Sequence, residues 1–96
     1  MMNGFNKGIF DILRDIFLSR FNIDLDIIPK ECLDKHLLGS VFKLAPRDLV
    51  YIYLDVEKKF DISLPDEEVA KGGMSTVNRL AEMIGRQLNK IERDAV

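Results

Sequence analysis

The stretch that decides the fold is KLAPRDLVYIYLDVEKKFDISLPDEE, residues 43–68. Its middle part, LVYIYLDV, is rich in residues that favour strands. Pro46 nevertheless suits a first helical turn, because its fixed φ fits a helix and its missing N–H is not needed there. We predict a helix over residues 47–60, because apolar side chains recur at steps of four, three and four, the spacing of one helix face. These side chains are Leu49, Tyr53, Val56 and Phe60.

A second helix start closes this stretch. Pro65 precedes three acidic residues, at positions 66–68, and carboxylates are favourable beside the positive end of a helix dipole. Gly72 and Gly73 follow as a stop signal. The sequence therefore predicts a short helix between Pro65 and this glycine pair.

Two longer apolar stripes flank these elements. Residues 5–21 place apolar side chains at helical spacing, and so does the segment after residue 76. Ser75 or Thr76 can cap the latter helix. The first stripe consists of Phe5, Ile9, Ile12, Leu13, Ile16, Phe17 and Phe21, widened by Phe10 and Leu18, and the second of Val77, Leu80, Ile84, Leu88 and Ile91.

The segment between the first two main helices, residues 22–46, is less regular. Pro29 can begin a short helix that Gly39 ends, and the remainder is typical of a loop. We expect Val41, Phe42 and Leu44 to hold that loop down. The whole pattern predicts an all-α fold, a small bundle of three main helices and one short helix, with a long loop between the first two.

Length and composition favour one soluble cytoplasmic domain over residues 1–96. A net charge of −2 gives no electrostatic reason to expect a nucleic acid or membrane partner. The single cysteine excludes an internal disulfide and fits a reducing compartment. Charged residues interrupt the N-terminal segment, so it matches neither a signal peptide nor a membrane span.

The segment VEKKFDISLPDEEVAKGGMSTVNRLAEMI, residues 56–84, resembles the C-terminal half of acyl carrier proteins. These proteins run E-E-x-F-x-I-x-I-P-D-E, then a short helix, then T-V-x-x-L. The resemblance covers most of the chain, is specific over residues 47–84, and implies the acyl-carrier-protein four-helix bundle. The matching positions are Glu57, Phe60, Ile62, Leu64, Pro65, Asp66, Glu67, Thr76, Val77 and Leu80.

Acyl carrier proteins attach phosphopantetheine to a serine in a D-S-L motif at the start of the second helix. Counted back from Phe60 without a gap, that motif falls on Ala45, Pro46 and Arg47, none of which matches. The pieces RDLVY and EKKFDI are similar to carrier-related proteins that lack the serine and accompany peptide-maturation enzymes in some bacterial gene clusters. This resemblance implies a non-catalytic interaction module with no cofactor, whose partner is a biosynthetic or peptide-maturation enzyme.

Two alternatives stay open. Ser40, in LGSV, precedes the second main helix, so a divergent working carrier would bear its phosphopantetheine there. Two features argue against Ser40. This serine has no acidic neighbour, and Pro46 prevents one continuous helix from starting at residue 40. The second alternative is a homo-oligomeric structural protein, although we take a monomer as the working state.

The second main helix is the predicted partner-binding site. The three basic and three acidic side chains of residues 47–60 give this helix a net formal charge of zero. It therefore does not attract a basic partner strongly. In the carrier register three apolar side chains point outwards, which suits a protein interface unless the preceding loop covers them. The predicted contact set is Arg47, Asp48, Leu49, Tyr51, Leu54 and Asp55.

Other chemistry has little support in the sequence. Cys32 and His36 are spaced to share a helix face, but a metal site needs three or four ligands and there is no second Cys or His. Nothing orients His36 as a base for a nucleophilic Cys32. We therefore predict neither a metal site nor an enzyme.

Overall fold

The computed structural model describes the backbone of residues 4–94 and the side chains of residues 8–90. Over this range the chain is all-helical and forms a four-helix bundle without strands, as predicted. The helices are α1 (Gly4–Phe21), η1 (Leu25–Ile27), η2 (Lys30–Asp34), α2 (Pro46–Phe60), α3 (Asp66–Glu68), η3 (Val69–Gly73) and α4 (Val77–Asp94). The predicted stripe positions Phe5 and Ile91 lie outside the described side chains.

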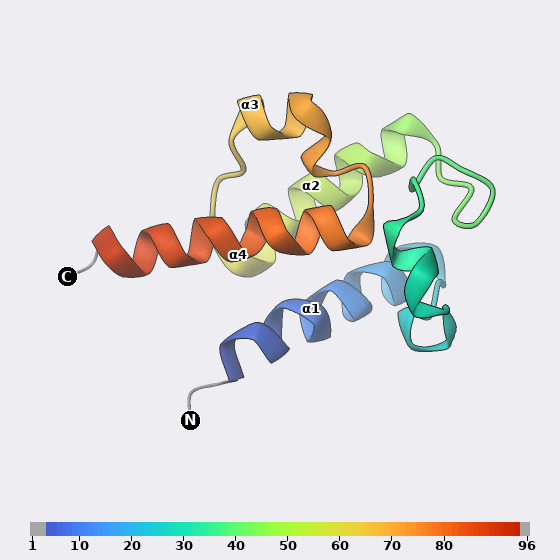
Figure 1. Cartoon of the computed structure of the whole chain (residues 1–96), viewed down its shortest axis with the longest axis horizontal. Helices are drawn as coiled ribbons and strands as arrows, with labels where there is room; N and C mark the ends of the chain where they lie inside the picture. Colours follow the sequence, from blue (N-terminus) through green and yellow to red (C-terminus); the bar gives the residue numbers. More distant parts are fainter. Residues whose placement is uncertain (1–3, 95–96) are drawn as a thin grey trace.

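Helix α1 packs against both α2 and α4, and α1 and α4 run side by side in opposite directions (Figure 1). Its predicted stripe is confirmed where side chains are described, because Ile9, Leu13, Ile16 and Phe17 are all buried. Leu18 does not widen the stripe, since 48% of its surface is exposed. It lies about 100° around the helix from Phe17, outside the buried face of α1.

Helix α2 forms despite its strand-favouring residues because its apolar spacing matches the helical period. Ile52 and Val56 are fully buried, and Leu49, Tyr53 and Phe60 pack against the core. The helix begins at Pro46, one residue before the predicted start, and ends before Asp61, whose backbone is left-handed at φ 56°. Tertiary burial of one helix face therefore overrides the local propensity.

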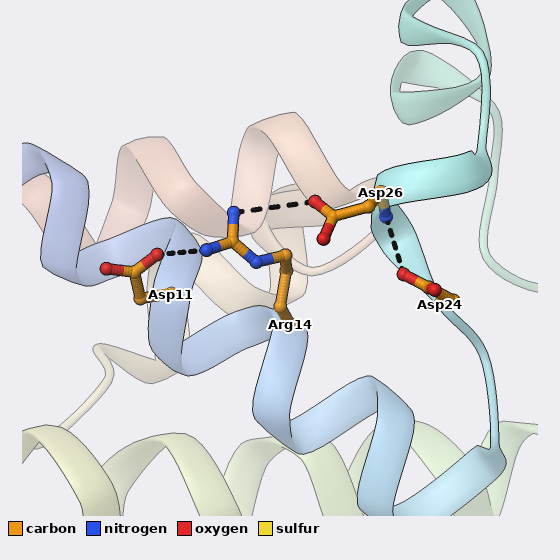
Figure 2. Close-up of polar contacts among 4 residues, drawn as sticks. All are labelled: Asp11, Arg14, Asp24 and Asp26. Atoms are coloured by element: carbon orange, nitrogen blue, oxygen red, sulfur yellow. Dashed lines mark hydrogen bonds and ion pairs between the residues drawn. The ribbon is translucent and has the colours of Figure 1, made fainter.

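The predicted short helix from Pro29 to Gly39 is only partly present. The structure has a 3₁₀ helix that ends at Asp34, after which the backbone of Lys35 becomes extended, and η1 is an additional turn that was not predicted. Figure 2 shows the polar contacts around η1, where the Asp24 carboxylate caps the helix start by accepting a hydrogen bond from the Asp26 N–H at 2.9 Å. The Arg14 guanidinium contacts both Asp11 and, at 3.6 Å, Asp26.

The long loop is held against the bundle by buried side chains. Leu37, Phe42 and Leu44 are buried, and the Phe17 and Phe42 rings meet edge to face at 6.2 Å. The predicted anchor Val41 is instead exposed, in the turn over residues 37–42. The Leu37 N–H donates to the Ser75 carbonyl at 2.8 Å, which joins the loop to the start of α4.

The predicted glycine stop forms the last two residues of η3. Gly72 has a φ of 92°, a left-handed conformation that glycine adopts without strain. Thr76 is the cap of α4, because its hydroxyl oxygen accepts a hydrogen bond from the Arg79 N–H at 3.0 Å. Ser75 has a different role, since its hydroxyl donates to the Gly72 carbonyl at 2.7 Å and closes the turn.

Helix α4 supplies the other large part of the core. Val77, Leu80, Met83 and Ile84 are fully buried, so Met83 joins the predicted stripe. None of the helices in the described part of the chain combines the length and apolar character needed to cross a membrane.

Candidate functional site

The start of α2 is the place where the carrier resemblance puts the phosphopantetheine serine. Pro46 is the first helical residue there, and it has no hydroxyl to which an arm could be attached. The Asp48 carboxylate accepts a hydrogen bond from the Ala45 N–H at 2.8 Å. Asp48, predicted as a partner contact, is therefore a capping group that stabilises its own helix start.

One face of α2 is left uncovered by the rest of the bundle. Val50, Tyr51 and Leu54 expose 56%, 43% and 54% of their surface, and Arg47 and Lys58 are exposed as well. The five positions follow at steps of three, one, three and four, so they lie on the same side of the helix. We call this set, Arg47, Val50, Tyr51, Leu54 and Lys58, the outer strip.

The outer strip differs from the predicted contact set at several positions. Tyr51, Leu54 and Arg47 are exposed as expected, but Leu49 is not on this face. Leu49 packs against the core instead, because it is three and four residues from Ile52 and Tyr53 on the buried side. Val50 was missed, and its spacing of four from Leu54 is the sequence signal that would have indicated it.

Asp55 is bound within the molecule. Arg20 of α1 donates from Nε and Nη2 to the two Asp55 carboxylate oxygens, at 2.6 and 2.9 Å. The hydrogen bond from Arg20 lowers the pKa of Asp55, although partial burial acts in the opposite direction. The same guanidinium lies over the Tyr51 ring, 4.9 Å from its centroid. Arg20 thus fixes Tyr51 at the edge of the outer strip, and no sequence pattern indicated this residue.

The third carboxylate of α2 is also engaged. The Glu57 side chain accepts a hydrogen bond from the Leu64 N–H at 2.8 Å, which ties the end of α2 to the segment before α3. Desolvation, together with the nearby Glu57 charge, raises the pKa of Tyr53. All three acidic residues of α2 therefore serve internal contacts.

An open apolar hollow of about 460 Å³ lies beside α2, between it and the α3–η3 segment. Leu49 and Tyr53 line it from α2, and Val50 forms its rim on the side of the outer strip. The remaining lining residues are His36, Val69, Ala70, Gly72, Met74 and Ser75. The hollow gives the outer strip an apolar neighbour on one side.

Ser40, the alternative attachment residue, is exposed in the turn over residues 37–42. It lies six residues before Pro46 and not at a helix start. The structure thus separates Ser40 from the position at which the resemblance expects a modified serine.

Cys32 and His36 do not share a helix face, because η2 ends at Asp34. His36 accepts a hydrogen bond from the Leu38 N–H at its Nδ1 atom, 3.1 Å away, and Cys32 is half-buried. Among the described residues there is no group of three or more His, Cys, Asp or Glu side chains placed to hold a metal ion.

Comparison of the chain with protein-family models, with curated proteins and with solved structures gave no match. The likeness to acyl carrier proteins therefore rests on the residues quoted from the sequence. Its functional consequences are a proposal.

Proposed function

We propose that this protein is a non-catalytic interaction module resembling an acyl carrier protein, and that it acts without phosphopantetheine. It docks to a biosynthetic or peptide-maturation enzyme through α2 and the loop before it. The observation that carries the proposal is the outer strip, on which Val50, Tyr51 and Leu54 are exposed together on one helix face. Apolar and aromatic side chains grouped in this way are typical of the centre of a protein interface.

The start of α2 supports the part of the proposal that concerns the arm. Proline occupies the position that the resemblance gives to the attachment serine, and the Asp48–Ala45 hydrogen bond caps the helix start. The charges of α2 do not favour a basic partner. Its carboxylates make contacts within the molecule and do not form an acidic docking face.

The docking site is tested with the double variant Tyr51→Asp and Leu54→Asp. We expect capture of the partner enzyme from the source organism to be lost, because two buried charges at the centre of an interface are costly. The helical circular dichroism spectrum should not change, since both side chains are about half exposed and neither belongs to the buried core.

The matched control is Leu18→Asp with Ile27→Asp, two exposed apolar residues away from α2. This variant should capture the partner as the unmodified chain does. The assignment of the docking site would be contradicted if the Tyr51 and Leu54 variant captured the partner as before. It would also be contradicted if both variants lost capture to the same extent.

A working carrier with its arm on Ser40 is the second candidate, favoured by the exposure of Ser40 in its turn. It predicts a covalent phosphopantetheine group, which the docking module does not have. A homo-oligomer built through the outer strip is a third candidate, and it predicts a molar mass that falls on dilution.

A further inference from the structure

The exposed charged side chains of α2 are all basic, namely Arg47, Lys58 and Lys59. Its three carboxylates are half-buried: Asp55 is paired with Arg20, and Asp48 and Glu57 accept hydrogen bonds from the Ala45 and Leu64 N–H groups. Arg47 and Lys58 are exposed and form no ion pair with any described side chain. A helix with zero formal charge therefore presents an outer strip with a cation at each end and apolar side chains between them.

We propose that the outer strip binds an acidic helical segment of a partner protein, with apolar side chains on one face and carboxylates at both ends. This inference rests on the proposed function and adds the chemistry of the partner. Arg47 and Lys58 would pair with the carboxylates, and Val50, Tyr51 and Leu54 would pack against the apolar side chains. Charge complementarity of this kind orients a partner and accelerates its association.

The dimensions of the strip set the size of the segment. Lys58 lies eleven positions after Arg47, which corresponds to about 16 Å along a helix. A partner helix of about three turns would match that length, with apolar residues at steps of three and four. Two carboxylates at the ends of such a helix would be as far apart as Arg47 and Lys58.

The aromatic residue of the outer strip is contacted by a side chain of α1. Arg20 holds the Tyr51 ring from one side at 4.9 Å while Asp55 fixes the guanidinium. Less conformational freedom is then lost when the ring packs against a partner.

The same charges disfavour a second copy of the chain as the occupant. In a two-fold antiparallel pairing of outer strips, Arg47 of each copy would face Lys58 of the other. In a parallel pairing, Arg47 would face Arg47 of the second copy and Lys58 would face Lys58. Like charges at both ends of the contact are repulsive. No exposed carboxylate of α2 offsets this repulsion, because the nearest one along the chain is Asp61, which follows the last residue of the helix.

Two synthetic helical peptides test the proposal on the full-length protein. They share an apolar face of leucines at steps of three and four, and they differ in having either glutamates or lysines at both ends of that face. Binding is measured by fluorescence anisotropy, and its location by amide chemical shifts in ¹⁵N-labelled protein. We expect the glutamate peptide to bind at least about tenfold more tightly, with shifts centred on residues 47–58. Raising the salt from about 0.05 M to about 0.5 M should weaken this binding.

The variant Arg47→Glu with Lys58→Glu should reverse the preference between the two peptides. The control Lys30→Glu with Lys90→Glu makes the same change of net charge at exposed positions elsewhere and should preserve it. Equal affinity for the two peptides, preference for the lysine peptide, shifts outside α2, or no binding of either would overturn the acidic-partner proposal. Self-association of the protein would overturn it in favour of a second copy.

These outcomes are separate from failure of the proposed function. If the lysine peptide bound on the same strip, the docking module would stand and its partner would be basic. A phosphopantetheine arm on Ser40 would instead contradict the module itself, whatever either peptide does.

Discussion

At the scale of single residues, Asp55 shows how a side chain that looks like a surface contact can be structural. Its two carboxylate oxygens accept hydrogen bonds from Arg20, a residue 35 positions earlier in the chain. The sequence places Asp55 on α2 but contains no signal for this long-range pair. Asp55 belongs to the predicted contact set, and only the packing of α1 against α2 shows its role.

The Arg20–Asp55 pair predicts a pH-dependent contribution to stability. The pKa of Asp55 is lowered in the folded protein by the hydrogen bond from Arg20. The contribution should therefore be fully present above the unfolded-state pKa, about 3.9, and lost as the pH falls through the lower folded-state value. Urea unfolding of the Asp55→Asn variant should show a deficit at neutral pH that shrinks under acid conditions.

Asp15→Asn is the matched control for this prediction, because Asp15 is an exposed carboxylate without a described partner. Its free energy of unfolding should stay close to that of the unmodified chain at neutral pH. A deficit in Asp55→Asn that is constant from neutral to strongly acid pH would contradict the role of the ionised pair.

At the scale of elements, the junction between η3 and α4 depends on a close approach at Gly73. A β-carbon added there would lie 2.7 Å from the Met83 Sδ atom and 2.8 Å from the Glu68 carbonyl oxygen. The backbone oxygen cannot yield without moving the last turn of the short helix. Gly73→Ala should therefore lower the free energy of unfolding by about 1 to 3 kcal/mol, measured by urea denaturation.

Gly8→Ala provides the contrast, because a β-carbon at this position in α1 meets no atom within 4 Å. Alanine should stabilise the helix there by about 0.5 to 1 kcal/mol. If both substitutions changed stability in the same direction, close packing at Gly73 would not be the reason for its glycine.

The elements that the sequence predicts well are the ones with a long apolar period. Ile9, Leu13 and Ile16 repeat over several turns, and so do the buried positions of α4. The 3₁₀ helices η1 and η2 have too few residues for a period. Their limits depend on local contacts such as the Asp24 side-chain cap, so one predicted helix from Pro29 became a shorter turn.

The same reasoning explains the partial success at the candidate site. The carrier register predicts that Leu49, Tyr51 and Leu54 all point outwards, and Tyr51 and Leu54 are exposed. Leu49 is not, because its spacing places it with the buried residues Ile52 and Val56. The spacing within the chain was the better guide to the exposed face.

At the scale of the whole molecule, internal pairing changes what α2 presents to a partner. Counting charges along the sequence gives zero, but Asp48, Asp55 and Glu57 are all used in contacts within the bundle. A sum over residues cannot separate half-buried charges from exposed ones. The structure does, because the three carboxylates are half-buried while Arg47, Lys58 and Lys59 are exposed beside the apolar side chains of the outer strip.

The central claim is that this carrier-like bundle acts without a phosphopantetheine arm. The most direct test is the intact mass of the protein after incubation with coenzyme A and a broad-specificity phosphopantetheinyl transferase, with an ordinary acyl carrier protein treated alongside. We predict no gain in mass under conditions that modify the ordinary carrier completely. A gain in mass that disappears in Ser40→Ala would contradict the account and identify a working carrier.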